Sequence, residues 1–370
     1  MTSPRQLRKL LIAGLVCINI LVVAFCSYFL HQSRLQYERT AEQLTQNIAS
    51  AVDQNVSASV DRIDLALRTV ADELERRLAD KTFDDSAINA FLARHEERLP
   101  EVEALRVANA EGEVILGKGV VRSAHASWAD RDYFIHHREK ADDTLRMAKP
   151  RIGRVAKQYI VGFSRRYNYP DGSFGGVISA PIAVSHFAQL LSRFDLGSQG
   201  IVALRDAELG LIARFPAAPE LPVGQVGNSA VSEQLLRLIE SGVQTATYYA
   251  PASADGKARL LTFHRLAKAP MIVISGRTQD DYLAGWKREL YLTSAIALGF
   301  VVLSIASGIF LVQQLRKTEH REQELRRSVE TRQRQHESLR RLNEIAALSH
   351  LPLAEQLVQA LTVGARLYGL

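Results

Sequence analysis

The sequence predicts an α/β chain, more narrowly α+β, in which long helices carry two antiparallel-sheet modules, and three observations support this class. Two uncharged apolar runs enclose a polar segment, residues 31–289. From Gln32 to Phe83 there is neither Gly nor Pro, and apolar residues recur at intervals of three and four. Behind this stretch, two strand-rich regions repeat the same order of hairpins, which indicates two copies of one module.

The charge distribution is a membrane-topology signal and excludes a nucleic-acid partner. The chain has 370 residues and a net charge of +6. Residues 1–9 and 313–350 each carry an excess of +3, whereas residues 31–289 balance 33 basic against 33 acidic residues. The excess therefore flanks apolar runs. Cys17 and Cys26 both fall in the first run, so the polar segment can form neither a disulfide nor a cysteine-based metal site.

The two apolar runs, residues 10–30 and 290–312, are each long enough to cross a lipid bilayer as a helix. A cleaved signal peptide is the alternative for the first run, but its apolar part would be shorter and end at small residues. Basic residues in the tail 1–9 and after the second run place both termini in the cytoplasm. We therefore expect residues 31–289 to be periplasmic and the chain to reside in a bacterial inner membrane.

The polar segment divides into a helix and two modules. Residues 31–80 predict a periplasmic stalk helix, residues 81–195 a membrane-distal module, and residues 196–286 a membrane-proximal one. A second helix is expected from the cap candidates Asp85 and Ser86 to a point before Pro100. The expected hairpins are 104–109 with 113–117 and 158–166 with 175–180 in the first module, and 201–214 and 259–276 in the second. The second module lacks a counterpart to Trp128–His137.

After the second apolar run, residues 313–350 predict a charged helix. Leu325, Val329 and Leu339 keep an imperfect heptad spacing, interrupted by two polar seam positions. This pattern favours a coiled-coil linker in a homodimer whose stalk helices associate; a single solvated helix is the alternative. Residues 342–370 begin a new amphipathic unit with a break at Pro352.

The polar segment contains two spaced signatures, Asp130-Arg131-Asp132-Tyr133-Phe134 with His137, and Ser164-Arg165-Arg166 followed by Asp171-Gly172-Ser173-Phe174-Gly175-Gly176-Val177. With the helices around them, they resemble the double Cache (tandem PDC) sensors of bacterial transmembrane receptors. The resemblance covers residues 10–315 and implies two PDC/PAS-like modules. It also implies an output domain outside this chain, either a GGDEF/EAL enzyme of cyclic-di-GMP metabolism or a histidine kinase. Residues 342–370 are similar to the opening helix of a GAF domain.

In that family, small ligands bind in the membrane-distal module, under the loop that carries the first signature. The resemblance and the side-chain chemistry give seven candidate ligand-binding residues: Trp128, Arg131, Tyr133, Arg154, Lys157, Tyr159 and Ser164. The guanidinium of Arg131 can hold a carboxylate through two hydrogen bonds, and the nearby cluster Arg151, Arg154 and Lys157 favours an anion. Alternatively, Arg131 pairs with Asp130 and Tyr133 belongs to the core.

Two departures from the family pattern bear on the ligand. Many relatives have Trp where Tyr159 stands, and the Arg-x-Trp-Tyr run of the amino-acid-binding subgroup is missing at Ser127-Trp128-Ala129. These departures weigh against an amino-acid ligand, and the expectation of a carboxylate-like ligand rests on Arg131. On the strand that follows, Tyr159, Val161 and Phe163 share one face and Ile160, Gly162 and Ser164 the other, and one of these faces should line the site.

The sequence gives no sign of catalysis, and we expect no catalytic residue, metal or cofactor. His136 and His137, adjacent on an expected strand, would point to opposite sides. Neither a Ser/His/Asp motif with an elbow glycine nor a phosphate-binding loop is present. The sequence thus predicts the sensory part of a receptor with a small-molecule ligand. A structural or protein-binding ectodomain without a ligand is the main alternative, and an exported hydrolase is the third.

Overall fold

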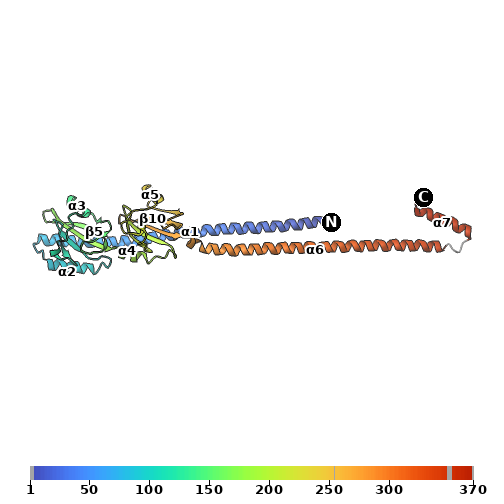
Figure 1. Ribbon diagram of the computed structural model, residues 1–370, viewed down its shortest axis with the longest axis horizontal. Coiled ribbons are helices and arrows are strands. Elements are labelled where there is room, and N and C mark those ends of the chain that lie inside the picture. Colours follow the sequence, from blue (N-terminus) through green and yellow to red (C-terminus); the bar gives the residue numbers. More distant parts are fainter. Residues whose placement is uncertain (1–3, 254, 348–351, 369–370) are drawn as a thin grey trace. The chain divides into compact units, whose positions relative to one another are not determined.

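The computed structural model describes residues 4–253, 255–347 and 352–368 and divides the chain into two compact units. One unit is Leu30–Glu289, and the other comprises Met1–Phe29 with Leu290–Leu370. Two long helices, α1 (Pro4–Ala79) and α6 (Gln279–Ala347), each continue from one unit into the other (Figure 1).

The first module of the unit Leu30–Glu289 is an antiparallel sheet with the strand order β2-β1-β6-β5-β3, and β4 also pairs with β5. Its elements are α2 (Asp85–Glu96), β1 (Arg106–Asn109), β2 (Val114–Gly117), η1 (Arg122–Ala124), α3 (Asp132–Glu139), β3 (Arg146–Met147), β4 (Arg151–Ile152), β5 (Tyr159–Asn168), β6 (Phe174–Ala183) and α4 (Val184–Leu191). The side chain of Asp84, one residue before the expected caps, accepts a hydrogen bond from the Ala87 amide and begins α2.

The second module has the strand order β8-β7-β11-β10-β9, which repeats the order of the first. Its elements are β7 (Ile201–Asp206), β8 (Leu211–Phe215), η2 (Pro222–Gly224), α5 (Glu233–Glu240), β9 (Thr245–Ala250), β10 (Arg259–Arg265) and β11 (Met271–Thr278). The predicted repeat of two antiparallel modules is confirmed. The expectation that the second copy has nothing at the place of α3 is wrong, because α5 occupies this place between the second strand and the edge strand.

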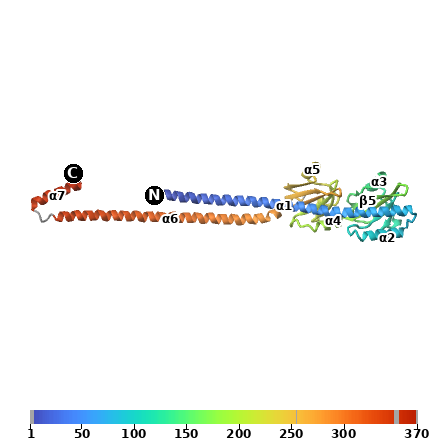
Figure 2. The same cartoon turned by 180° about the vertical axis from the view of Figure 1, so that it is seen from behind.

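A single apolar face of α1 forms the core of both modules. Its buried residues follow helical spacing and are Ile48, Val52, Val56, Val60, Ile63, Leu67, Val70 and Leu74. They pack against Phe163 and Ile178 of the first sheet and against Leu204 and Val273 of the second, in one continuous cluster. Figure 2 shows α1 running across both modules. A displacement of either sheet would therefore change its packing against the same helix.

The start of α6 packs on α1 beside the second sheet. β11 leads directly into α6, and Tyr282 and Leu283 bury against Ala41. The indole of Trp286 donates a hydrogen bond to the carbonyl oxygen of Leu30 at 2.9 Å. The last strand of the second module is thus joined without a loop to the helix that leaves the unit.

In the other unit, α1 and α6 each contain a stretch long and apolar enough to cross a membrane, judged by length and composition. The Asn19 amide donates to the Ser304 hydroxyl at 2.7 Å, and a Cβ added at Gly308 would come within 2.6 Å of the end of the Leu15 side chain. α6 continues past Leu342 to Ala347, and α7 (Leu353–Tyr368) follows. The segment just before the predicted break at Pro352, residues 348–351, lies outside the described residues.

Candidate ligand site

A cavity lies on the face of the first sheet that points away from α1, under the segment that carries the Asp-Arg-x-Tyr-Phe signature. It is small, with a volume of about 40 Å³. The residues that line it are Arg106, Trp128, Arg131, Tyr133, Ala148, Arg151, Gly153, Arg154, Val155, Ala156, Ile160, Gly162, Ser179 and Pro181. Strand alternation explains this placement, because Val161 and Phe163 face the α1 core whereas Ile160 and Gly162 face the cavity.

Four arginines line the cavity, and three of them have carboxylate partners. Arg154 holds Asp130 through two hydrogen bonds of 2.6 Å. Arg151 donates to Asp132 at 2.7 Å. The buried Arg106 of β1 lies 2.7 Å from Glu103, and its Nε donates to the carbonyl oxygen of Lys118 at 3.1 Å.

Arg131 is the fourth arginine and differs from the others. Within the described part of the chain, its guanidinium has neither a hydrogen-bond partner nor an ion-pair partner. It is half-buried, and its pKa is lowered by burial and by the positive charges of Arg154 and Arg151. The alternative in which Asp130 pairs with Arg131 is wrong, because Asp130 is held by Arg154. Arg131 is therefore a cation whose environment favours an added anion.

Two hydroxyl groups complete the polar lining. Neither the Tyr133 hydroxyl nor the Ser179 hydroxyl makes a hydrogen bond within the ranges that the structure describes. The ring of Tyr133 packs edge-on against Trp128, with ring centroids 6.2 Å apart, and both rings border the cavity. Burial raises the pKa of Tyr133, so its phenol stays protonated and can donate to an anion.

The structure brings four of the seven candidate residues to the cavity and leaves three outside it. Trp128, Arg131, Tyr133 and Arg154 line the cavity. Lys157, in a left-handed backbone conformation, borders a separate depression with Arg154. Tyr159 is on the other face of β5 and 45% exposed. Ser164 is on the cavity side of β5, but its hydroxyl lies 3.1 Å from His137 and it does not line the cavity.

Sequence reasoning missed two polar lining residues, Arg106 and Ser179. They lie opposite each other on β1 and β6, and Ser179 also lies opposite Ser164 on β5. Only the strand register places these residues in one row, and the sequence offered no signal for that register. Arg151 was recognised within a cationic cluster but not as a lining residue.

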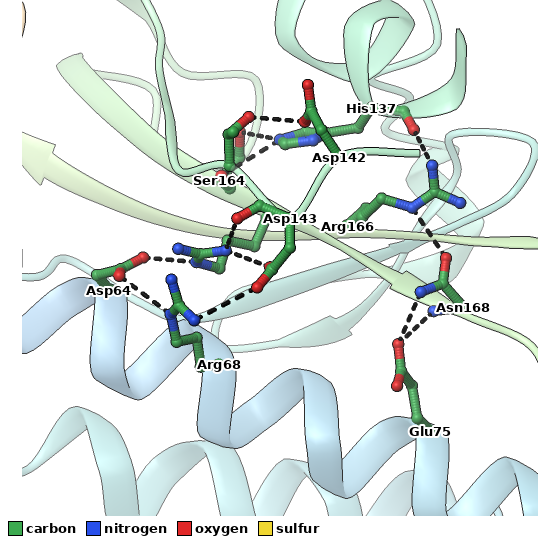
Figure 3. A network of polar contacts seen from close by, with 11 residues as sticks. Asp64, Arg68, Glu75, His137, Asp142, Asp143, Ser164, Arg166 and Asn168 are labelled. Carbon is green, nitrogen blue, oxygen red and sulfur yellow. Dashed lines mark hydrogen bonds and ion pairs between the residues drawn. The ribbon is translucent and has the colours of Figure 1, made fainter. Parts of the chain in front are cut away.

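A polar network connects the far end of α3 with α1 (Figure 3). His137 lies against Ser164, and Arg166 donates to the carbonyl oxygens of His137 and Lys140. Arg166 also donates to the side chain of Asn168, whose backbone amide donates to Glu75 at 2.8 Å. Arg165, which is 3% exposed, binds both Asp64 and Asp143, and Arg68 also reaches both carboxylates. Asp64, Arg68 and Glu75 all belong to α1. The segment after α3 is thus fastened to the stalk helix.

His136 and His137 lie on the helix α3, so the expectation of a strand at this place is wrong. Helix geometry turns His137 into the core, where the side chain is fully buried. Because the Ser164 carbonyl can only accept, its contact of 3.2 Å makes His137 Nε2 the donor. In the described ranges, no group of three or more His, Cys, Asp or Glu side chains is placed to hold a metal ion.

Comparison with solved structures places this fold among extracellular sensor domains. The extracellular domain of the putative histidine kinase rpHK1S-Z16 matches with a TM-score of 0.59 and 23% identity, over 67% of this chain and 98% of its own. An extracellular ligand-binding receptor from Desulfohalobium retbaense matches with a TM-score of 0.50 and 12% identity, over 63% of this chain and 40% of its own. The ligand-binding domain of the Campylobacter jejuni chemoreceptor Tlp3, solved with L-norvaline, matches with a TM-score of 0.49 and 13% identity, over 66% of this chain and 92% of its own.

The chain therefore has the fold of receptor sensor domains of the double Cache type, as the two signatures predicted. No protein-family model and no curated protein matches the sequence.

The buried imidazole of His137 predicts a specific loss of stability in acid. Burial lowers its pKa to about 4 from an ordinary value of 6.5. The unfolded chain then binds the additional proton between these two values, so the stabilisation is complete above pH 6.5 and is lost as pH falls toward 4, by roughly 3 kcal/mol. Urea unfolding of the wild type and of His137→Gln, compared across this range, should show a flatter pH profile for the variant.

The exposed His125, changed to Gln, serves as the control and should retain the wild-type profile. Equal slopes for the wild type and His137→Gln would contradict the assignment of this loss of stability to His137.

Proposed function

We propose that this protein is the sensory part of an inner-membrane receptor whose periplasmic first module binds a small anion, with a carboxylate as the leading candidate. The observation that carries the proposal is the half-buried Arg131, which is without a partner in the described structure and lies beside two free hydroxyls. A guanidinium and two hydroxyl donors match the acceptors of one carboxylate. The small volume of the cavity favours a small ligand.

Features of both units support the proposed membrane arrangement. Residues 10–30 and 290–312 would cross the bilayer, with the basic segments beside them in the cytoplasm. The hydrogen bond between Asn19 and Ser304 and the close approach at Gly308 support a packed helix pair, because small and polar residues join helices in lipid. Residues 31–289 would then be periplasmic and both termini cytoplasmic.

Ligand binding has a route to both long helices. Arg131 directly precedes α3, whose other end is tied through His137 and Arg166 to β5. From β5, Arg165 reaches Asp64 of α1. α1 in turn packs on the second sheet, whose last strand continues into α6. A ligand that prefers one position of α3 would shift the populations of two receptor states through these contacts.

The cytoplasmic part of α6 would form the coiled coil of a homodimer. Leu325, Val329, Leu339 and Leu342 are between 49% and 68% exposed, so the apolar seam is uncovered in the single chain. A second copy would bury it. The receptor's output, a diguanylate cyclase or phosphodiesterase or a histidine kinase, would follow the GAF-like start at residues 342–370.

Loss of the Arg131 guanidinium should abolish stabilisation by anions. A ligand at 100 times its Kd adds about 2.7 kcal/mol to the stability of the folded state, which raises the melting temperature by roughly 5 °C. We expect this shift when the full chain in detergent is screened against small carboxylates, and its disappearance in Arg131→Gln. The control is Arg138→Gln, the same change on the exposed side of α3. If every carboxylate leaves the wild type unchanged, the ectodomain is instead a structural or protein-binding one.

The polar network should transmit the effect of the ligand to α1. Hydrogen exchange of the full chain with a bound carboxylate should slow at α3 and at the α1 segment 61–75, relative to the empty state. Arg165→Lys keeps the charge but removes the fork that bridges Asp64 and Asp143, so it should preserve the effect at α3 and reduce it at α1. An unchanged α1 in the liganded wild type would contradict this route.

Cysteine labelling tests the membrane arrangement. In a background without Cys17 and Cys26, Asp171→Cys in the exposed β5–β6 turn should react with a membrane-impermeant maleimide in spheroplasts. Glu319→Cys, partly exposed on α6, should react only after lysis. Labelling of Glu319→Cys in intact spheroplasts would reverse the assignment.

A further inference from the structure

We infer that the cavity selects small carboxylates that carry no ammonium group and discriminates against α-amino acids. The inference rests on the proposed anion-binding function and adds the chemical class of the ligand. It comes from the pairing pattern around the cavity: Asp130, Asp132 and Glu103 are each paired with an arginine, whereas Arg131 has no partner among the described residues.

An α-amino acid needs two opposite charges in its site. Its carboxylate could pair with Arg131, but its ammonium group requires a carboxylate or several hydrogen-bond acceptors. Among the described residues, those that line the cavity include four arginines and neither Asp nor Glu. An ammonium group here would lie among like charges without a counter-ion.

The carboxylates around the cavity are unavailable to a ligand. Asp130 is held by both nitrogens of the Arg154 fork at 2.6 Å. Asp132 accepts from Arg151 at 2.7 Å, and Glu103 lies 2.7 Å from Arg106. A ligand ammonium that recruited one of these carboxylates would leave an arginine at the cavity wall without a partner.

The free polar groups fit a carboxylate with a hydrogen or a hydroxyl at its α-carbon. Arg131 supplies a bidentate donor, and the hydroxyls of Tyr133 and Ser179 can each donate or accept. A ligand hydroxyl can pair with either of them without adding charge. Ile160, Ala148 and Gly162 provide an apolar floor for a short carbon chain.

The pairing of Arg154 with Asp130 makes the selectivity testable by a single substitution. Arg154→Gln removes one positive charge and releases Asp130 at the rim of the cavity. The released carboxylate becomes available to an ammonium group. This variant should therefore lose discrimination against amino acids, whereas Arg131→Gln should lose binding of the whole series.

The experiment is calorimetric titration of the full chain in lipid nanodiscs with two matched series of ligands. The first series is propionate, L-lactate and L-alanine. The second is succinate, L-malate and L-aspartate. Within each series, the members differ in the hydrogen, hydroxyl or ammonium group at one carbon. We expect at least one hydroxy or unsubstituted acid to bind tenfold or more tightly than its amino counterpart. In Arg154→Gln this ratio should fall below about threefold, and Arg138→Gln should retain the wild-type ratio.

Two other outcomes would separate a failure of the selectivity from a failure of the proposed function. If L-alanine or L-aspartate binds the wild type as tightly as its hydroxy counterpart and loses affinity in Arg131→Gln, the selectivity is overturned while the anion site stands. If none of the six compounds binds the wild type at 10 mM, both the selectivity and the proposed function fail.

Discussion

The structure of the unit Leu30–Glu289 depends on one interaction, the burial of a single apolar face of α1 against both sheets. Each buried Val, Leu or Ile side chain contributes roughly 1.5–3 kcal/mol. The face from Ile48 to Leu74 meets Phe163 and Ile178 of one sheet and Val273 of the other. The two modules therefore share a core through α1, and a change in one alters the packing of a helix that the other also requires.

In each central strand of the first sheet, successive side chains point to opposite faces. Residues such as Val161 and Phe163 face α1, and the intervening ones face the cavity or α3. Arg165 is an exception to an apolar inner face, since its buried guanidinium joins Asp64 of α1 to Asp143. An ion pair at this place specifies where the loop after α3 meets the stalk, which apolar packing alone would leave undefined.

The fold class and the general place of the site could be predicted from the sequence because they rest on local patterns. Helical spacing identified α1, repeated hairpins identified the two modules, and the Asp-Arg-x-Tyr-Phe signature located the cavity. The remaining features depend on tertiary pairing. Arg106 and Ser179 reach the cavity through the register of β1 with β6. Ser164 lies on β5, but its hydroxyl contacts His137 of α3, and the sequence pattern does not reveal this contact. Sequence alone could not decide which arginine would be left unpaired.

The unpaired arginine explains why a receptor of this construction would respond to its ligand. A half-buried guanidinium beside Arg151 and Arg154 has lost hydration without gaining a partner, so the empty site is unfavourable in this position of α3. An anion removes that cost only where Arg131, Tyr133 and Ser179 converge. Under the proposed function, an anion at Arg131 would stabilise one arrangement of α3 over others, and this difference in affinity is the condition for any shift between receptor states. If Asp130 neutralised Arg131 instead, the same cavity would bind anions less well and would change little on binding. Because Arg154 pairs with Asp130, Arg131 at the start of α3 is left as the group through which the proposed anion binding would be coupled to movement.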